Sequence, residues 1–295
     1  RKKQSLSSKN GSKDYAANLE AGADTAGPLH HGAMRDEGAV WMLRQLLLSL
    51  MAPPDVRLNM SVSSVLHGAW MEILSPEYAG HLHEQGLRPY SQSVVFDGEG
   101  NALWRIGSLT DEVYERAILP LLSQEELFLR QKGYAIGLRL RKERVSSYEE
   151  LADGCFRGAE LVRRSNLRFL TATSFRRDGQ YMIWPEATQL FGNLLRRWNA
   201  FSPAVKLEEA RLEETLAEIC SWSRYRLYSR TFSLEGKWIT GFGGELTLRF
   251  QGTEMARRII ALLLSFAPFS GVGIKTALGM GAVETTIYLA HSQND

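Results

Sequence analysis

Apolar and polar positions change their spacing from segment to segment along the chain, and each spacing predicts an element. A dense apolar run at 41–51 is stopped by two prolines, which predicts a buried strand. Between 61 and 74 the apolar residues recur at three- and four-residue steps, which predicts a helix with one apolar stripe. Pro76 is suited to open a second, short helix that ends near His83.

The following segments complete one unit of strands and helices. Segments 90–97 and 103–109 flank a short turn with two glycines, which predicts a hairpin. We expect Asp111 to cap a helix that runs to about Leu122, and further strands around 127–145. The order strand, helix, strand, strand, helix, strand is typical of a ferredoxin-like fold.

The same order then recurs in the second half of the chain. Strands are expected at 167–175, 226–233, 245–250 and 283–289, and helices at 186–198, 208–220 and 255–266. We therefore predict an α+β protein of two tandem ferredoxin-like (RRM-like) domains, 40–155 and 156–295.

Residues 1–39 are rich in Ser, Gly, Ala, Asn and Asp and hold few large apolar side chains. Such a segment cannot bury enough surface to offset its ordering entropy, so we interpret it as a flexible leader or linker. Its first 13 residues carry five basic side chains and no acidic one, which suits a nucleic-acid arm but is more often a solvated tail.

The composition of the 295-residue chain narrows the class further. Two cysteines, Cys155 and Cys220, exclude a disulfide scaffold and favour the reducing cytoplasm. No apolar run approaches the roughly 18 residues of a membrane span, so no membrane partner is expected. The sequence shows no metal-ligand cluster, and we expect neither a metal nor a cofactor.

The net charge is only +2, so a nucleic-acid site would have to come from local clustering of basic residues. Arg176 and Arg177 form one such cluster, and the stretch 224–230 interleaves arginine with tyrosine. Arginine contacts phosphates and stacks on bases, but a charged run is also typical of a solvated face. Both interpretations stay open.

A glycine-rich stretch lies between the last helix and the last strand. Residues 269–281 read FSGVGIKTALGMG and contain Gly271, Gly273, Lys275, Gly279 and Gly281. Glycine permits positive φ and close backbone approach, and exposed amides beside a lysine can hold phosphates. The spacing fits neither a Walker loop nor a Rossmann fingerprint. On composition alone, a connection that binds no ligand is the favoured interpretation.

The string 269–281 resembles the C-terminal glycine-rich loop of the RAMP superfamily, most closely that of the CRISPR repeat-processing endoribonucleases. Three further segments are similar to the same family, at 66–69 (LHGA), 79–91 (AGHLHEQGLRPYS) and 185–199. The four motifs occur in the family's order and together cover about 41–289. The resemblance implies two ferredoxin-like domains of the RAMP type.

The implied activity is that of a metal-independent endoribonuclease that binds CRISPR repeat RNA and cleaves precursor CRISPR RNA. The 2′-hydroxyl beside the scissile phosphate attacks it, leaving a 2′,3′-cyclic phosphate and a 5′-hydroxyl. CRISPR effector or adaptation proteins are further partners that the family admits. The resemblance assigns RNA binding to the glycine loop with Lys275.

The resemblance also implies catalytic residues. His83 falls on the family's histidine in the Leu-His-Glu segment, and histidine titrates near neutral pH. His67 is its rival, either facing a groove or, as we favour, sitting at a boundary and bonded to a carbonyl. Arg88 falls near a lysine of some members and is suited to stabilise charge but not to donate a proton.

Two other classes remain as alternatives. A non-catalytic RAMP subunit that binds guide RNA would share the fold and the glycine loop but would need no catalytic histidine. An RNA-recognition-motif protein unrelated to CRISPR is disfavoured, because no Lys/Arg-Gly-Phe/Tyr-Gly/Ala-Phe-Val string occurs.

Overall fold

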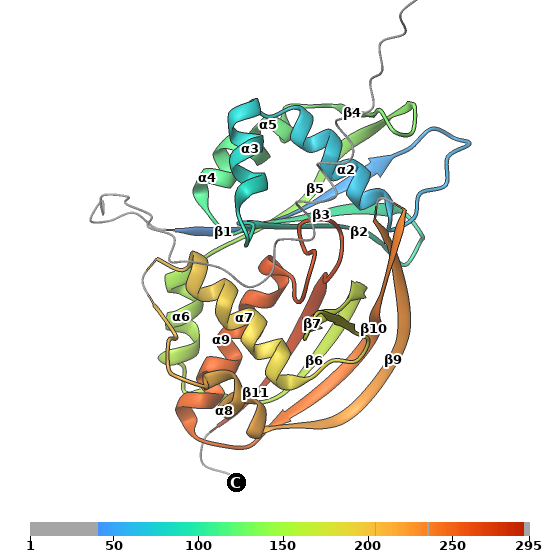
Figure 1. Cartoon of the computed structure of the whole chain (residues 1–295). Coiled ribbons are helices and arrows are strands. Elements are labelled where there is room, and N and C mark those ends of the chain that lie inside the picture. Colours follow the sequence, from blue (N-terminus) through green and yellow to red (C-terminus); the bar gives the residue numbers. More distant parts are fainter. Residues whose placement is uncertain (1–40, 204, 235, 292–295) are drawn as a thin grey trace, which may run out of the picture.

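The protein, represented by a computed structural model, consists of two antiparallel sheets with helices packed on them (Figure 1). The structure describes residues 41–203, 205–234 and 236–291. The predicted leader or linker, 1–39, lies outside the described residues.

The first half builds a five-stranded sheet in the order β2-β3-β1-β5-β4. Its strands are β1 (Met42–Met51), β2 (Tyr90–Phe96), β3 (Ala102–Ser108), β4 (Glu126–Leu129) and β5 (Tyr134–Ser147). Its helices are α2 (Val62–Glu72), α3 (Pro76–Glu84), α4 (Asp111–Val113), a π-helical turn (Tyr114–Ile118) and α5 (Leu119–Leu122), and α6 (Tyr148–Phe156) follows β5.

The second half builds a four-stranded sheet in the order β11-β6-β10-β9. Its strands are β6 (Glu160–Thr173), β9 (Cys220–Leu234), β10 (Lys237–Phe250) and β11 (Val283–His291), and a separate hairpin joins β7 (Phe175–Arg177) to β8 (Gln180–Met182). Its helices are α7 (Ala187–Phe201), α8 (Leu212–Glu218) and α9 (Glu254–Ser270). In the second sheet the first strand, β6, lies between β10 and β11, as a four-stranded ferredoxin-like unit requires. In the first sheet β1 lies between β3 and β5 in the same way, and the short β4 is added at the edge beyond β5.

Two local predictions were wrong. Thr110, not Asp111, caps the helix after β3, because the Thr110 hydroxyl accepts the Val113 amide at 3.3 Å while the Asp111 carboxylate accepts the amide of Met42 at 3.2 Å. The helix expected at 208–220 is only α8, because residue 220 already pairs with β10, so β9 begins there. A strand partner outweighed the local helical pattern.

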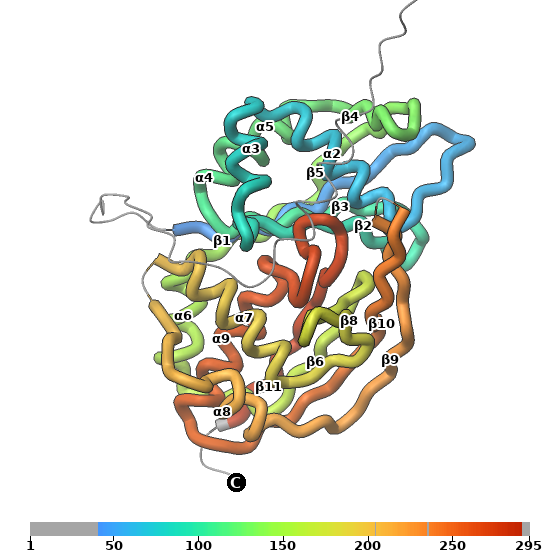
Figure 2. The backbone as a smooth tube through the Cα atoms, in the orientation of Figure 1, coloured from blue at the N-terminus to red at the C-terminus, as the bar shows by residue number. Residues whose placement is uncertain are grey.

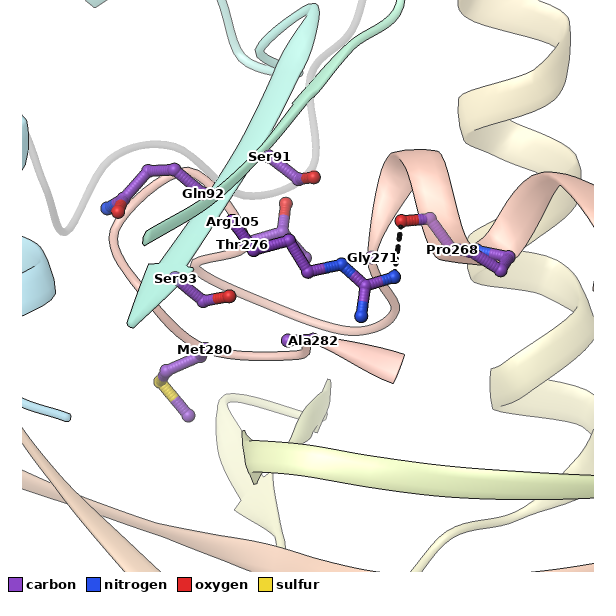
Figure 3. A pocket seen from close by; sticks show the side chains of 9 residues that line it. All are labelled: Ser91, Gln92, Ser93, Arg105, Pro268, Gly271, Thr276, Met280 and Ala282. Carbon is purple, nitrogen blue, oxygen red and sulfur yellow. Dashed lines mark hydrogen bonds between the residues drawn. The ribbon is translucent and has the colours of Figure 1, made fainter. Parts of the chain in front are cut away.

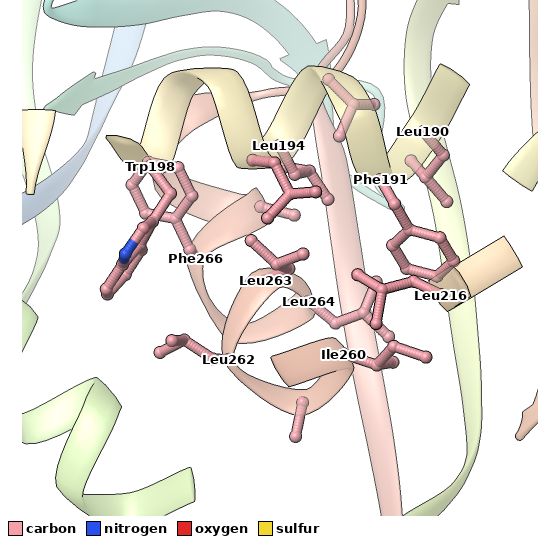
Figure 4. Packing of buried hydrophobic residues seen from close by; sticks show 14 of the residues in the cluster. Leu190, Phe191, Leu194, Trp198, Leu216, Ile260, Leu262, Leu263, Leu264 and Phe266 are labelled. Atoms are coloured by element: carbon pink, nitrogen blue, oxygen red, sulfur yellow. The ribbon is translucent and has the colours of Figure 1, made fainter. Parts of the chain in front are cut away.

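Each half has its own apolar core, and the core of the second half reaches into the first. In Figure 4, Leu194 and Trp198 of α7 lie against Leu263 and Phe266 of α9. The same cluster includes Leu43 of β1 and Tyr148 of α6. Fully burying one such side chain contributes about 1.5–3 kcal/mol, so this shared packing holds the two halves together. The division at 155/156 stays a prediction.

The glycine-rich loop between α9 and β11 lies against the sheet of the first half, and Figure 2 shows it in red beneath β2 and β3. The Gln92 backbone amide and side chain donate to the carbonyls of Thr276 and Ala277, each at 2.9 Å. Arg105 of β3, 7% exposed, donates to the carbonyls of Pro268 and Val283, both at 2.9 Å. Figure 3 shows Arg105 reaching Pro268. The loop therefore joins the two halves.

Candidate active site

His83 lies in the last turn of α3, where the helix meets the loop that leads to β2. Pro76 stands in the first turn of this helix, and the Ser75 hydroxyl accepts the amide of Tyr78 at 3.3 Å. The His83 side chain is partly exposed. Its ring centroid is 6.2 Å from that of His67 on α2, so the structure brings the two predicted histidines together.

His67 is buried beneath His83, with 1% of its surface exposed. Its Nε2 is 2.8 Å from the hydroxyl of Tyr90, whose ring it stacks on, and it meets Trp70 edge-on. Burial, with the nearby Arg88 and His83, lowers the pKa of His67 to about 3. It is therefore a neutral, buried imidazole that does not face a groove, and the partner that the structure gives it is a hydroxyl where the sequence favoured a carbonyl.

His83 is suited to accept a proton. Partial burial lowers its pKa below 6.5, and the positive charge of Arg88 lowers it further. At neutral pH the imidazole is therefore mostly uncharged, which is the form in which it can act as a general base.

Arg88 connects the site to both halves of the protein. Its Nε donates to the carbonyl of Leu82 at 3.1 Å and satisfies a carbonyl at the end of α3. Its own carbonyl accepts Nη2 of Arg197, a buried residue of α7, at 3.4 Å. Arg197 lies in the 185–199 motif, but nothing in the sequence distinguishes a buried arginine from a surface one, so its role could not be predicted.

The glycines of the loop let other backbone segments of the same protein approach closely. Gly271, Gly273, Gly279 and Gly281 all have positive φ and are buried. A Cβ on Gly273 would lie 2.3 Å from the Ser174 carbonyl oxygen. The Gly273 amide donates to Oδ1 of Asn193 at 2.8 Å. Lys275, with φ of 55°, is partly exposed. The phosphate contacts expected of this loop stay a prediction.

Arg176 and Arg177 lie on the exposed hairpin of β7 and β8, in the second half. Nη1 of Arg177 is 2.7 Å from a carboxylate oxygen of Glu186, just before α7. Arg176 and Arg177 therefore lie on a different element from His83 and Arg88. Its contact with RNA also stays a prediction.

Within the described ranges, no three His, Cys, Asp or Glu side chains lie together in a group that could hold a metal ion. In the same ranges, no helix is long and apolar enough to cross a membrane.

Two antiparallel sheets with the first strand of each in the interior, a glycine-rich loop packed between the two halves, and a histidine whose pKa is lowered by a nearby arginine are the features expected of a RAMP-type RNA-processing enzyme. The comparisons then give the family. The model of "CRISPR-associated endoribonuclease Cas6" matches residues 167–283.

A protein of that name from Streptococcus thermophilus is 31% identical over 222 residues, 74% of this chain and 88% of the relative. Another from Mycobacterium tuberculosis is 28% identical over 242 residues, 81% of this chain and 76% of the relative. The structure titled "Cas6 (TTHA0078) product complex" has 29% identity and a TM-score of 0.68, covering 83% of this chain and 99% of that one. The chain belongs to the CRISPR-associated endoribonuclease Cas6 family, and it is an endoribonuclease.

This membership confirms the predicted family, fold class and enzyme class, and it excludes the RNA-recognition-motif protein unrelated to CRISPR.

Proposed function

We propose that this enzyme binds CRISPR repeat RNA and cleaves precursor CRISPR RNA by attack of the 2′-hydroxyl on the adjacent phosphate. The bond between phosphorus and the 5′-oxygen of the next nucleotide breaks, leaving a 2′,3′-cyclic phosphate and a 5′-hydroxyl. The nucleophile belongs to the RNA, so the protein has to move protons and stabilise charge. A relative of similar fold solved as a product complex supports this proposal. We place the activity in the cytoplasm, in keeping with two free cysteines.

One observation carries the mechanism: the partly exposed His83 imidazole, with its lowered pKa, beside Arg88. We assign His83 as the general base that takes the proton of the 2′-hydroxyl, and the leaving 5′-oxygen takes up a proton from solvent. The guanidinium of Arg88 stabilises the negative charge that develops on the phosphate. His67, buried and held by Tyr90, supports the site from beneath as a positioning residue.

The same proposal assigns RNA contacts outside the reacting atoms. Lys275, Arg176 and Arg177 neutralise phosphates. The carbonyl of Lys275 accepts the amides of Leu278 at 2.9 Å and Met280 at 3.3 Å, which fixes its left-handed backbone conformation at the junction of the two halves. Affinity is then spread over several contacts, so the loss of one catalytic side chain should leave most of the binding intact.

The decisive test is His83→Ala, measured as a single-turnover cleavage rate on repeat RNA. We expect the rate to fall about 10²- to 10⁴-fold, the usual contribution of general acid–base catalysis, with RNA affinity unchanged within a few-fold. His81→Ala is the matched control, because His81 lies on the same helix, is exposed and bonds only locally to Gln85 at 2.8 Å. A near-normal rate for His83→Ala would contradict the assignment. A large loss of rate for His81→Ala would instead assign the general-base role to His81.

The reaction chemistry is tested separately on the substrate. Cleavage should continue in EDTA, and a 2′-deoxy nucleotide at the scissile position should block it while binding persists. Cleavage that stops in EDTA and returns with magnesium would refute the proposed mechanism.

A further inference from the structure

A cluster of aromatic side chains lies on the surface of the second half, away from the histidines. Trp184, between β8 and α7, stacks on Trp222 of β9 with ring centroids 5.4 Å apart and planes 6° from parallel. Tyr225, also on β9, stands 5.6 Å from Trp184 at 82°. Trp184 and Tyr225 are 46% and 62% exposed. Large aromatic rings left this open to solvent indicate a binding site more often than a packing role.

Trp184, Trp222 and Tyr225 form a rigid aromatic corner. Trp222 packs against the apolar core of the second half, so it is fixed from below. It covers one face of Trp184 and thereby holds that ring flat, while Trp184 remains nearly half exposed. The ring of Tyr225 stands almost perpendicular to the ring of Trp184. The open face of Trp184, with Tyr225 at its edge, can therefore accept a flat, aromatic ligand.

The chain around the corner is basic. The exposed hairpin before Trp184 carries Arg176, which pairs across its strands with Tyr181. Arg224 and Arg226 are the chain neighbours of Tyr225, so their side chains lie on the opposite face of β9 from its ring. Stacking rings among arginines are typical of proteins that bind single-stranded nucleic acid, in which rings receive bases and arginines receive phosphates. An apolar protein surface would bind less well here, because it would have to cover charged arginine side chains without pairing them.

Helix α7 sets the distance between this corner and the catalytic residues. Trp184 comes three residues before the start of α7, and Arg197 near its other end bonds to the Arg88 carbonyl. The ten residue-to-residue steps from Ala187 to Arg197 span about 15 Å at the rise of an α-helix. Figure 1 shows α7 running from beside the β7–β8 hairpin to the first half. The corner is therefore separate from the His83 and Arg88 site.

We propose that Trp184, supported by Trp222 and walled by Tyr225, stacks a nucleobase of single-stranded RNA at a position several nucleotides from the cleaved bond. The inference rests on the proposed function for the identity of the ligand. It adds a binding site for the unpaired part of the substrate. Because every base presents a flat face, this site tolerates any sequence.

The probe is a short, 5′-labelled oligoadenylate, which contains stackable bases and no repeat sequence. We expect Trp184→Ala to weaken its binding about 5- to 150-fold, the usual contribution of one stacked base. Trp184→Phe keeps a ring and should stay within a few-fold of wild type. Since no charge is lost, the salt dependence of binding should keep its slope, which a general disruption of the basic surface would change.

The matched control is Phe128→Ala, which removes an aromatic side chain, 58% exposed, from β4 of the first half. Affinity unchanged by Trp184→Ala, an equal loss from Phe128→Ala, or a wild-type protein that binds no oligoadenylate would each overturn the proposal. If Trp184→Ala does not fold by circular dichroism, Tyr225→Ala decides in its place. Cleavage of repeat RNA by the wild type tests the proposed function independently, so the two can fail separately.

Discussion

Replacing Gly273 by alanine should destabilise the fold before it affects any RNA contact. Gly273 has φ of +83°, and an added Cβ would lie 2.3 Å from the carbonyl oxygen of Ser174. That oxygen accepts the amide of Ile274 at 2.9 Å, so moving it away disrupts a buried hydrogen bond. Alanine at 273 therefore meets both a conformational and a steric obstacle.

The magnitude follows from these two costs. A left-handed conformation costs a residue with a Cβ roughly 1–2 kcal/mol. Losing the Ser174–Ile274 hydrogen bond in a buried setting costs about 1–3 kcal/mol more. The free energy of unfolding should fall by about 2–5 kcal/mol, and each kcal/mol lowers Tm by about 2–4 °C in a protein of this size class.

Gly179→Ala separates the two costs. Gly179 has φ of +78°, but an added Cβ would meet nothing within 4 Å, so only the conformational cost of about 1–2 kcal/mol applies. Thermal and urea unfolding of both variants measure the difference. Equal losses in the two variants would refute the steric argument. A Gly273→Ala protein of normal stability with weakened RNA binding would show that the glycine serves the ligand and not the packing.

Three further outcomes test the site. Arg88→Ala removes a positive neighbour, so the pKa of His83 should rise and the acidic limb of the pH–rate profile should move to higher pH; an unmoved limb would contradict their coupling. Lys275→Ala should flatten the slope of log K against log salt by about 0.7 on single-stranded RNA, and an unchanged slope would remove Lys275 from the interface. His67 binds a proton near pH 6.5 when unfolded but only near 3 when folded, so protein stability should fall as pH drops between those values. Urea unfolding of His67→Gln should show a weaker pH dependence over that range, and an unchanged dependence would contradict the buried, neutral assignment.

The sequence by itself determined most of the elements and their order, but not α6 or the β7–β8 hairpin. Apolar periodicity predicted β1, α2 and the β2–β3 hairpin, because local spacing decides which face of a strand or helix can be buried. The glycine spacing of 269–281 and the Leu-His-Glu segment around His83 pointed to the family that the comparisons then gave. Each of these signals lies within a short stretch of the chain, so one sequence is enough to detect it.

Only the tertiary structure decided what those residues contact. A helical wheel could not tell that Tyr90, from a strand 23 residues on, covers and bonds His67. It could not show that Arg197 reaches the carbonyl of Arg88 across the junction of the halves. The close approach allowed by Gly273 is made to Ser174, about a hundred residues earlier in the chain. Burial and bonding partners depend on distant segments packing together, and no local pattern records which segments meet.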